Sequence, residues 1–239
     1  MEFDLFSIAI LTVAVPAAFA LSAAAGFGGS LILVPVLMMT TGVKEGVALS
    51  ALLLAANNLV KAYAYRKTLP LKSSALIAIA VMFGAALGAQ LMIVAPESWV
   101  KGFVIVMFLA TFALDFLPYG VTRKSWAGIM AFTAGATSGF SGMSGPLKGV
   151  AIRSLGLDRQ YLVGAAAMVS LVGDATKAAV FNNAGLLSKE AWILAGILLP
   201  VMIISTYAGR YINHSIGEKG FMALFWTVIL GYSARLVLN

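Results

Sequence analysis

The stretch Gly26-Phe27-Gly28-Gly29-Ser30 interrupts a largely apolar run that extends from Phe3 to Thr41. Glycine has no side chain, so it permits a sharp turn and lets another group approach the backbone closely. A second cluster, Gly142-Met143-Ser144-Gly145-Pro146, lies 116 residues later in a similar setting. We expect each cluster to interrupt a helix, and we expect the two clusters to line one site.

The composition indicates an integral membrane protein. Of the 239 residues, 61% are hydrophobic and only 10% are charged, and the mean hydropathy is +0.98. A soluble domain carries about a quarter charged residues. Apolar segments of about 20 residues recur along the chain, which is the length that a membrane-spanning helix needs. The sequence therefore predicts an all-α, polytopic membrane protein.

Two further features of the composition exclude classes of site and partner. The chain has no cysteine, so it forms no disulfide and no thiolate metal site. The net charge of +7 comes mostly from cations in short loops, where they set membrane topology. We therefore expect no nucleic-acid partner.

The chain divides into two repeats, residues 1–120 and 121–239, with the same order of segments. The predicted apolar segments are 3–25, 30–41, 45–65, 71–94 and 98–118, then 126–141, 146–156, 160–181, 190–213 and 217–238. The second segment of each repeat is too short to span the membrane comfortably and is predicted as a half-helix. Residues 26–65 align with 142–181 without a gap, and eight of the 40 pairs are identical, including Lys61 with Lys177.

The loop cations predict how the two repeats are oriented. In one arrangement, each interrupted pair of segments returns the chain to its starting side, and the loops then carry nine cations on one side of the membrane and three on the other. In the other arrangement, each interrupted pair crosses the membrane once, and the loops carry six cations on each side. Positive charges gather on the cytoplasmic side, so the first arrangement is preferred. It places both termini outside and makes the repeats inverted, a recurrent transporter design with the site near the midplane.

The glycine clusters have the chemistry of an anion site. A helix that begins inside the membrane exposes unpaired N–H groups, and its dipole adds roughly half a positive charge there. Both effects favour an anion. Small residues also occur where membrane helices pack tightly, which is the alternative interpretation. The predicted ligand-binding residues of the turns are Gly26, Phe27, Gly28, Gly29, Ser30, Gly142, Met143, Ser144, Gly145 and Pro146.

Polar side chains also lie within the long segment that follows each half-helix. Asn58 aligns with Asp174. A lysine at bilayer depth costs about 2.5–3.5 kcal/mol unless it is partnered. Asp174 precedes Lys177 by three residues, so the two can pair, whereas Lys61 has an amide at that position and a bound anion could supply the negative charge. We predict Asn58, Lys61 and Lys177 as substrate ligands and Asp174 as a candidate for proton coupling.

Two alternatives remain open for the lysines. Lys61 and Lys177 each lie four residues from a segment end, so they could instead extend to the lipid headgroups. Lys148, near the second glycine cluster, is either a further anion ligand or an anchor at the cytoplasmic surface. The sequence alone does not choose between these positions.

At the glycine clusters the chain resembles the TauE/SafE family of sulfite exporters, also called toluene sulfonate uptake permeases. The family pattern is a Gly-x-Gly-Gly-rich stretch followed by an apolar run with proline, once per half. Residues 25–35 match it well, and residues 138–146 match less fully because Ser144 replaces a glycine and Ala151 replaces the proline that corresponds to Pro35. The resemblance implies transport of sulfur-containing anions, such as sulfite or organosulfonates, across the inner membrane.

We therefore expect a secondary carrier that binds such an anion between two inverted repeats. An anion channel and a carrier for small carboxylates are the alternatives. No residue set suggests an enzyme, a metal site or a cofactor. Membrane lipid is an expected partner, and a homodimer is one possible oligomeric state.

Overall fold

The computed structural model describes residues 5–25, 29–115, 126–144 and 147–215, and the described part is entirely helical. The helices of the predicted first repeat are α1 (Leu5–Ala25), α2 (Gly29–Thr41), α3 (Val43–Ala64), α4 (Leu71–Val94) and α5 (Glu97–Asp115), with a short 3₁₀ turn, η1 (Arg66–Thr68). Those of the second are α6 (Ala127–Ser141), α7 (Leu147–Arg153), α8 (Arg159–Asn183) and α9 (Lys189–Ser215). The predicted segment 217–238 lies outside the described residues.

Within the described ranges, four helices are long and apolar enough to cross a membrane: Val43–Ala64, Leu71–Val94, Tyr161–Asn183 and Lys189–Tyr211. The segment predicted over 30–41 is the 13-residue helix α2, which is too short to span. The segment predicted over 146–156 is shorter than expected, because α7 has only seven residues. Helix α7 ends at Arg153, and Gly156, three residues later, adopts a left-handed φ of 63°.

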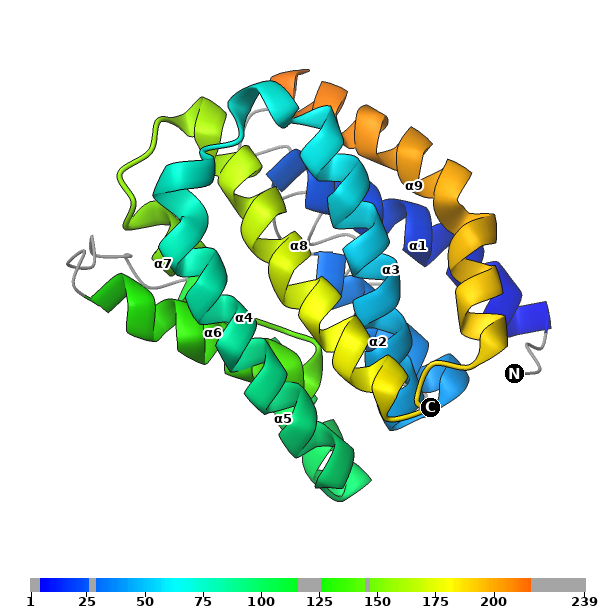
Figure 1. Ribbon diagram of the computed structural model, residues 1–239. Coiled ribbons are helices and arrows are strands. Elements are labelled where there is room, and N and C mark those ends of the chain that lie inside the picture. The colour runs from blue at the N-terminus through cyan, green and yellow to red at the C-terminus, as the bar shows by residue number, and fades with distance from the viewer. Residues whose placement is uncertain (1–4, 26–28, 116–125, 145–146, 216–239) are drawn as a thin grey trace.

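The two central helices, α3 and α8, occupy equivalent places in the two repeats. They pack side by side through the middle of the molecule and run in opposite directions (Figure 1). Among the described residues, the buried charged and amide side chains lie on these two helices: Asn57, Asn58 and Lys61 on α3, and Asp174 and Lys177 on α8. The residues with the highest desolvation cost are thus placed furthest from lipid.

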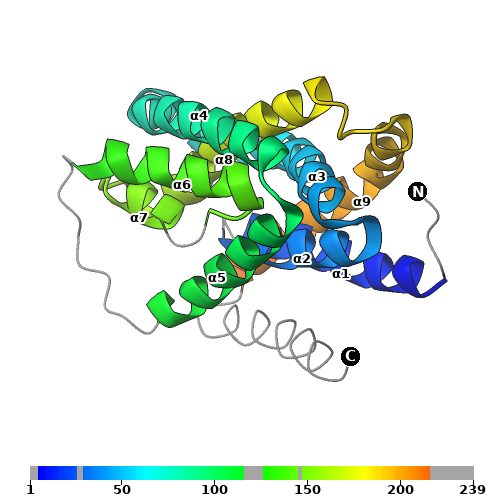
Figure 2. The ribbon, with the colours of Figure 1, turned by 90° about the horizontal axis from the view of Figure 1, so that it is seen from below.

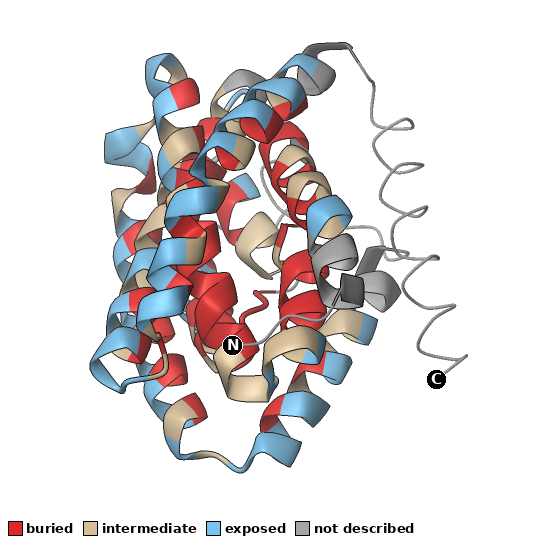
Figure 3. Cartoon of the chain, turned by 90° about the vertical axis from the view of Figure 1, so that its right-hand side faces the viewer, coloured by how far each residue is buried: buried red, intermediate tan, exposed pale blue. Residues whose placement is uncertain are grey.

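The outer helices bury small residues and expose large apolar ones. On α4, Gly84 and Gly88 face the bundle, while Leu76, Phe83 and Leu87 are about half or more exposed. Figure 3 shows the same division, with buried residues inside and exposed residues on the outer faces. Such an apolar exterior suits lipid, where helices associate by close packing of small residues.

The two repeats interlock rather than standing apart. Helix α4 of the first repeat packs along α6 of the second, as Figure 2 shows, and α9 of the second packs on α1 of the first. A Cβ atom at Gly84 or Gly135 would collide with the backbone of the facing helix, at Phe132 and Val81 respectively. Glycine is therefore required along this contact because the two backbones touch.

Candidate functional site

Each buried lysine is held by a serine from the helix that precedes the glycine cluster of its own repeat. Lys61 Nζ donates to Ser22 Oγ at 3.0 Å and to the Ser22 carbonyl oxygen at 3.3 Å. Lys177 Nζ donates to Ser138 Oγ at 2.8 Å. The sequence separation is 39 residues in both pairs, and the pairs are offset by the same 116 residues as the glycine clusters.

These contacts decide between the two interpretations of the lysines. Both side chains are fully buried, with exposed fractions of 0%, and both amines point inward to serines. Extension to the headgroups is therefore wrong for Lys61 and Lys177. The predicted pair of Asp174 with Lys177 is confirmed, since Asp174 Oδ1 lies 2.7 Å from Lys177 Nζ.

The second carboxylate oxygen joins the two repeats. Asn58 Nδ2 donates to Asp174 Oδ2 at 2.7 Å, and both groups are buried. Asn58 and Asp174 are themselves equivalent positions, 116 residues apart. One carboxylate thus accepts hydrogen bonds from the lysine of its own repeat and from the amide of the other.

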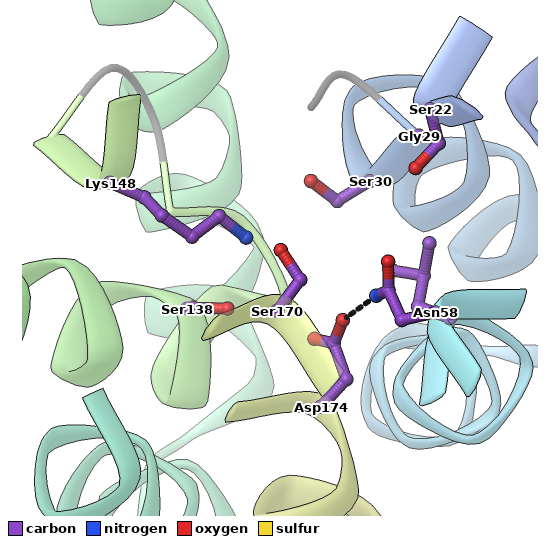
Figure 4. A pocket seen from close by; sticks show the side chains of 10 residues that line it. Ser22, Gly29, Ser30, Asn58, Ser138, Lys148, Ser170 and Asp174 are labelled. Atoms are coloured by element: carbon purple, nitrogen blue, oxygen red, sulfur yellow. Dashed lines mark hydrogen bonds between the residues drawn. The ribbon is translucent and has the colours of Figure 1, made fainter. Parts of the chain in front are cut away.

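A small polar cavity lies beside this contact, where the two repeats meet (Figure 4). Its volume is about 20 Å³, enough for about one water molecule. The described residues that line it are Ser22, Gly29, Ser30, Leu54, Asn58, Ser138, Gly142, Lys148, Ser170 and Asp174. Three pairs among them are equivalent in the two repeats: Ser22 with Ser138, Leu54 with Ser170, and Asn58 with Asp174.

Both glycine clusters reach this cavity. Gly29, the first residue of α2, has no room for a side chain, since a Cβ atom there would lie 3.0 Å from the Cβ atom of Ser22. Gly142 ends α6 with a left-handed φ of 77°, and a Cβ atom there would lie 2.7 Å from a methyl group of Val34. Conformation and space therefore both require glycine at Gly142.

The sequence-predicted site residues fall into four groups. Gly29, Ser30, Asn58, Gly142 and Asp174 line the cavity. Lys61 and Lys177 are not among the lining residues but contact lining side chains: Lys61 contacts Ser22, and Lys177 contacts Ser138 and Asp174. Met143 and Ser144 are buried but are not among the lining residues. Gly26, Phe27, Gly28, Gly145 and Pro146 lie outside the described residues.

The structure also resolves the two interpretations of Lys148. Its side chain extends from α7 and its amine ends in the cavity, pointing toward Ser170 and Asp174 (Figure 4). Lys148 therefore lines the site instead of anchoring the chain at the membrane surface. Sequence reasoning overlooked Ser22, Ser138 and Ser170, although Ser22 and Ser138 could be found by extending the alignment of the repeats four residues upstream.

The sequence was compared with families, curated proteins and solved structures. The family model described as sulfite exporter TauE/SafE matches residues 10–236, nearly the whole chain. The chain belongs to the TauE/SafE family. Neither the curated proteins nor the solved structures give a match. This TauE/SafE protein is thus a membrane protein of a transporter family, and its polar cavity lies between its two central helices and the starts of its short ones.

Proposed function

We propose that this TauE/SafE protein is a secondary carrier for small sulfur-containing anions, such as sulfite or organosulfonates, in the bacterial inner membrane. The observation that carries the proposal is the cavity between the repeats, which combines the start of α2, a lysine amine and serine hydroxyls inside an apolar bundle. Such groups are the donors that an oxyanion requires. Family membership supports sulfur oxyanions as the class of substrate.

The anion binds near the midplane, where Lys148 and the serine hydroxyls donate to its oxygens. The turns at Gly29, Ser30 and Gly142 bring backbone close to it. Lys61 and Lys177 act from behind the wall. They orient Ser22 and Ser138 and add positive potential, because each serine oxygen that accepts from a lysine keeps its own proton free to donate.

The two repeats are inverted and alternate the access of the cavity between the two sides of the membrane. The opposite directions of α3 and α8 and the recurrence of the lysine–serine contacts support this arrangement. Asp174 is the candidate for proton coupling, since it is the carboxylate that touches both repeats. The cavity holds only about one water molecule in this conformation, so the repeats must move apart to admit the larger anion, as they do in a carrier.

Flux in proteoliposomes tests this proposal. We expect saturable uptake of sulfite or a sulfonate that exchanges with internal substrate, and no single-channel currents. Lys61→Ala and Lys177→Ala should each lower the flux at least about tenfold, since one lost charge-assisted hydrogen bond corresponds to about 1.5–3 kcal/mol. Lys101→Ala, an exposed lysine on α5, is the matched control and should retain full flux.

The outcomes separate the parts of the proposal. Unchanged flux in both Lys61→Ala and Lys177→Ala would remove these lysines from the mechanism while leaving the substrate assignment in place. Transport of small carboxylates with no response to any sulfur anion would overturn the substrate assignment itself.

A further inference from the structure

The cavity carries one positive charge that its own wall does not balance. Among the described lining residues, the charged groups are Lys148 and Asp174. Asp174 is already paired with Lys177 at 2.7 Å. Lys148 therefore keeps its charge at the wall, and the buried amine of Lys61 lies behind the wall on Ser22, so the surroundings favour an anion.

The cavity also contains an acceptor that has no donor. Asn58 is 2% exposed, and its Oδ1 atom is buried without a hydrogen-bond partner. Its orientation is fixed, because Nδ2 donates to Asp174 Oδ2 at 2.7 Å and a flipped amide would place two oxygens together. Figure 4 shows the Asn58 oxygen turned into the cavity, away from Asp174.

A buried acceptor without a donor costs about 1–3 kcal/mol. A ligand that brings its own donor would recover that free energy, whereas a ligand with only lone pairs would place an oxygen against an oxygen. The cavity thus presents Lys148 and the hydroxyls of Ser22 and Ser138 as donors and Asn58 Oδ1 as an acceptor.

We propose that the site selects a small anion that carries a hydrogen-bond donor, and that the form of sulfite it binds is hydrogen sulfite. This inference rests on the transport function proposed above and names the protonation state of the substrate. Lys148 donates to the charged oxygens, and Asn58 Oδ1 accepts a hydrogen bond from the O–H group of the ligand. The sulfite dianion, which has no proton, would leave Asn58 Oδ1 without a donor.

The test measures binding of total sulfite to the purified full chain by calorimetry between about pH 6 and 8, the range in which sulfite gains its second charge. Chlorate is the reference ligand, since it has the pyramidal shape and the single charge of hydrogen sulfite but no proton. The titratable groups around the cavity in the described chain are Lys61 on α3, Lys148 on α7, and Asp174 and Lys177 on α8. Their titration affects both ligands, so the ratio of the two affinities isolates the proton of the ligand.

We expect hydrogen sulfite to bind at least about fivefold more tightly than chlorate, as one net hydrogen bond of about 1 kcal/mol allows. The apparent Kd of total sulfite should rise about tenfold for each pH unit once the dianion dominates, relative to chlorate. These two results need no variant and therefore do not depend on a mutant that folds.

Variants of Asn58 and Lys148 then test the role of each side chain in binding. Asn58→Leu should remove most of the preference for hydrogen sulfite over chlorate, whereas Lys148→Met should weaken both ligands by a similar factor. Lys101→Met, on the exposed face of α5, should change neither.

Equal affinity for chlorate and hydrogen sulfite would overturn the inference, because a water molecule would then satisfy Asn58 Oδ1. Tighter binding at higher pH, or a preference for sulfate, would also overturn it by showing a dianion site. Both results would leave sulfur-anion transport intact. Failure of every sulfur oxyanion to bind would instead remove the proposed function and this inference together.

Discussion

At the scale of single residues, Asp174 is the group on which the polar centre depends. Its two oxygens each accept one hydrogen bond at 2.7 Å, from Lys177 in its own repeat and from Asn58 in the other. Removal of one partner from a buried ion pair leaves an uncompensated charge, which costs far more than the pair contributes. Asp174 therefore has a structural role whatever its part in transport.

Asp174→Asn should destabilise the protein by about 3–5 kcal/mol, because Lys177 loses its counter-charge inside the bundle. Equilibrium unfolding in detergent measures the change. The double variant Asn58→Asp/Asp174→Asn should recover most of the loss, since the carboxylate then stands three residues before Lys61 and opposite an amide. A double variant no more stable than Asp174→Asn would show that the two positions are not interchangeable.

Ser22→Ala and Ser138→Ala should each cost about 1–3 kcal/mol of unfolding free energy, because a buried amine loses its hydroxyl acceptor. Ser74→Ala is the matched control: Ser74 is fully buried, but its hydroxyl has no hydrogen-bond partner, so its loss should be nearly neutral. The same unfolding measurement compares all three variants. Equal losses at Ser22 and Ser74 would refute the role of the lysine–serine contact.

The sequence predicts some of these contacts and not others. Asp174 and Lys177 share a helix face at a spacing of three, so their pair follows from local geometry. Ser22 lies 39 residues from Lys61, and only the tertiary fold brings the two side chains together. The direction of the Lys148 side chain depends on which face of α7 is turned toward the bundle. With only seven residues, α7 is too short for its apolar pattern to indicate that face.

At the scale of helices, the closest contact joins α4 and α6 through glycines on both sides. A Cβ atom at Gly88 would collide with the carbonyl oxygen of Ala136, and one at Gly139 would collide with that of Ala85. The sequence predicts both helices with nearly the observed bounds, because each is a continuous apolar segment. It does not predict their partnership, since the two belong to different repeats.

Gly88→Ala should therefore destabilise the protein by about 1–3 kcal/mol or more, because the helices must separate to admit a methyl group. Gly128→Ala on α6 is the matched control, since a Cβ atom there meets nothing within 4 Å and alanine favours the helix by about 0.8–1 kcal/mol. Thermal unfolding of the two variants in the same detergent should move in opposite directions. A shift in the same direction would argue against the close backbone contact.

At the scale of the whole molecule, the arrangement of the repeats determines which loops face each side of the membrane. Lys67 follows α3 and Lys189 begins α9 after α8, so the two lie at comparable places in the repeats. The loop-charge count predicts that these places lie on opposite sides. This prediction depends on how many times the chain crosses the membrane. If a short helix and its neighbour made one crossing instead of returning the chain to its starting side, every later loop would move to the other side.

Single cysteines test this assignment directly, because the chain contains none of its own. A membrane-impermeant maleimide added outside intact cells should label Lys101→Cys and Lys189→Cys. It should label Lys67→Cys only after the membrane is permeabilised. All three positions are exposed, so labelling reports the side rather than burial. Labelling of Lys67→Cys and Lys189→Cys from the same side would exclude inverted repeats.

The contact between Asn58 and Asp174 has a consequence for the symmetry of the molecule. A dimer of identical half-length subunits would place the same residue on both sides of its symmetry axis. Two aspartates there would repel each other, and two asparagines would provide no charge for a buried lysine. Two halves that differ in sequence can instead place a matched amide and carboxylate there. The difference between the halves thus allows a polar centre that exact symmetry forbids.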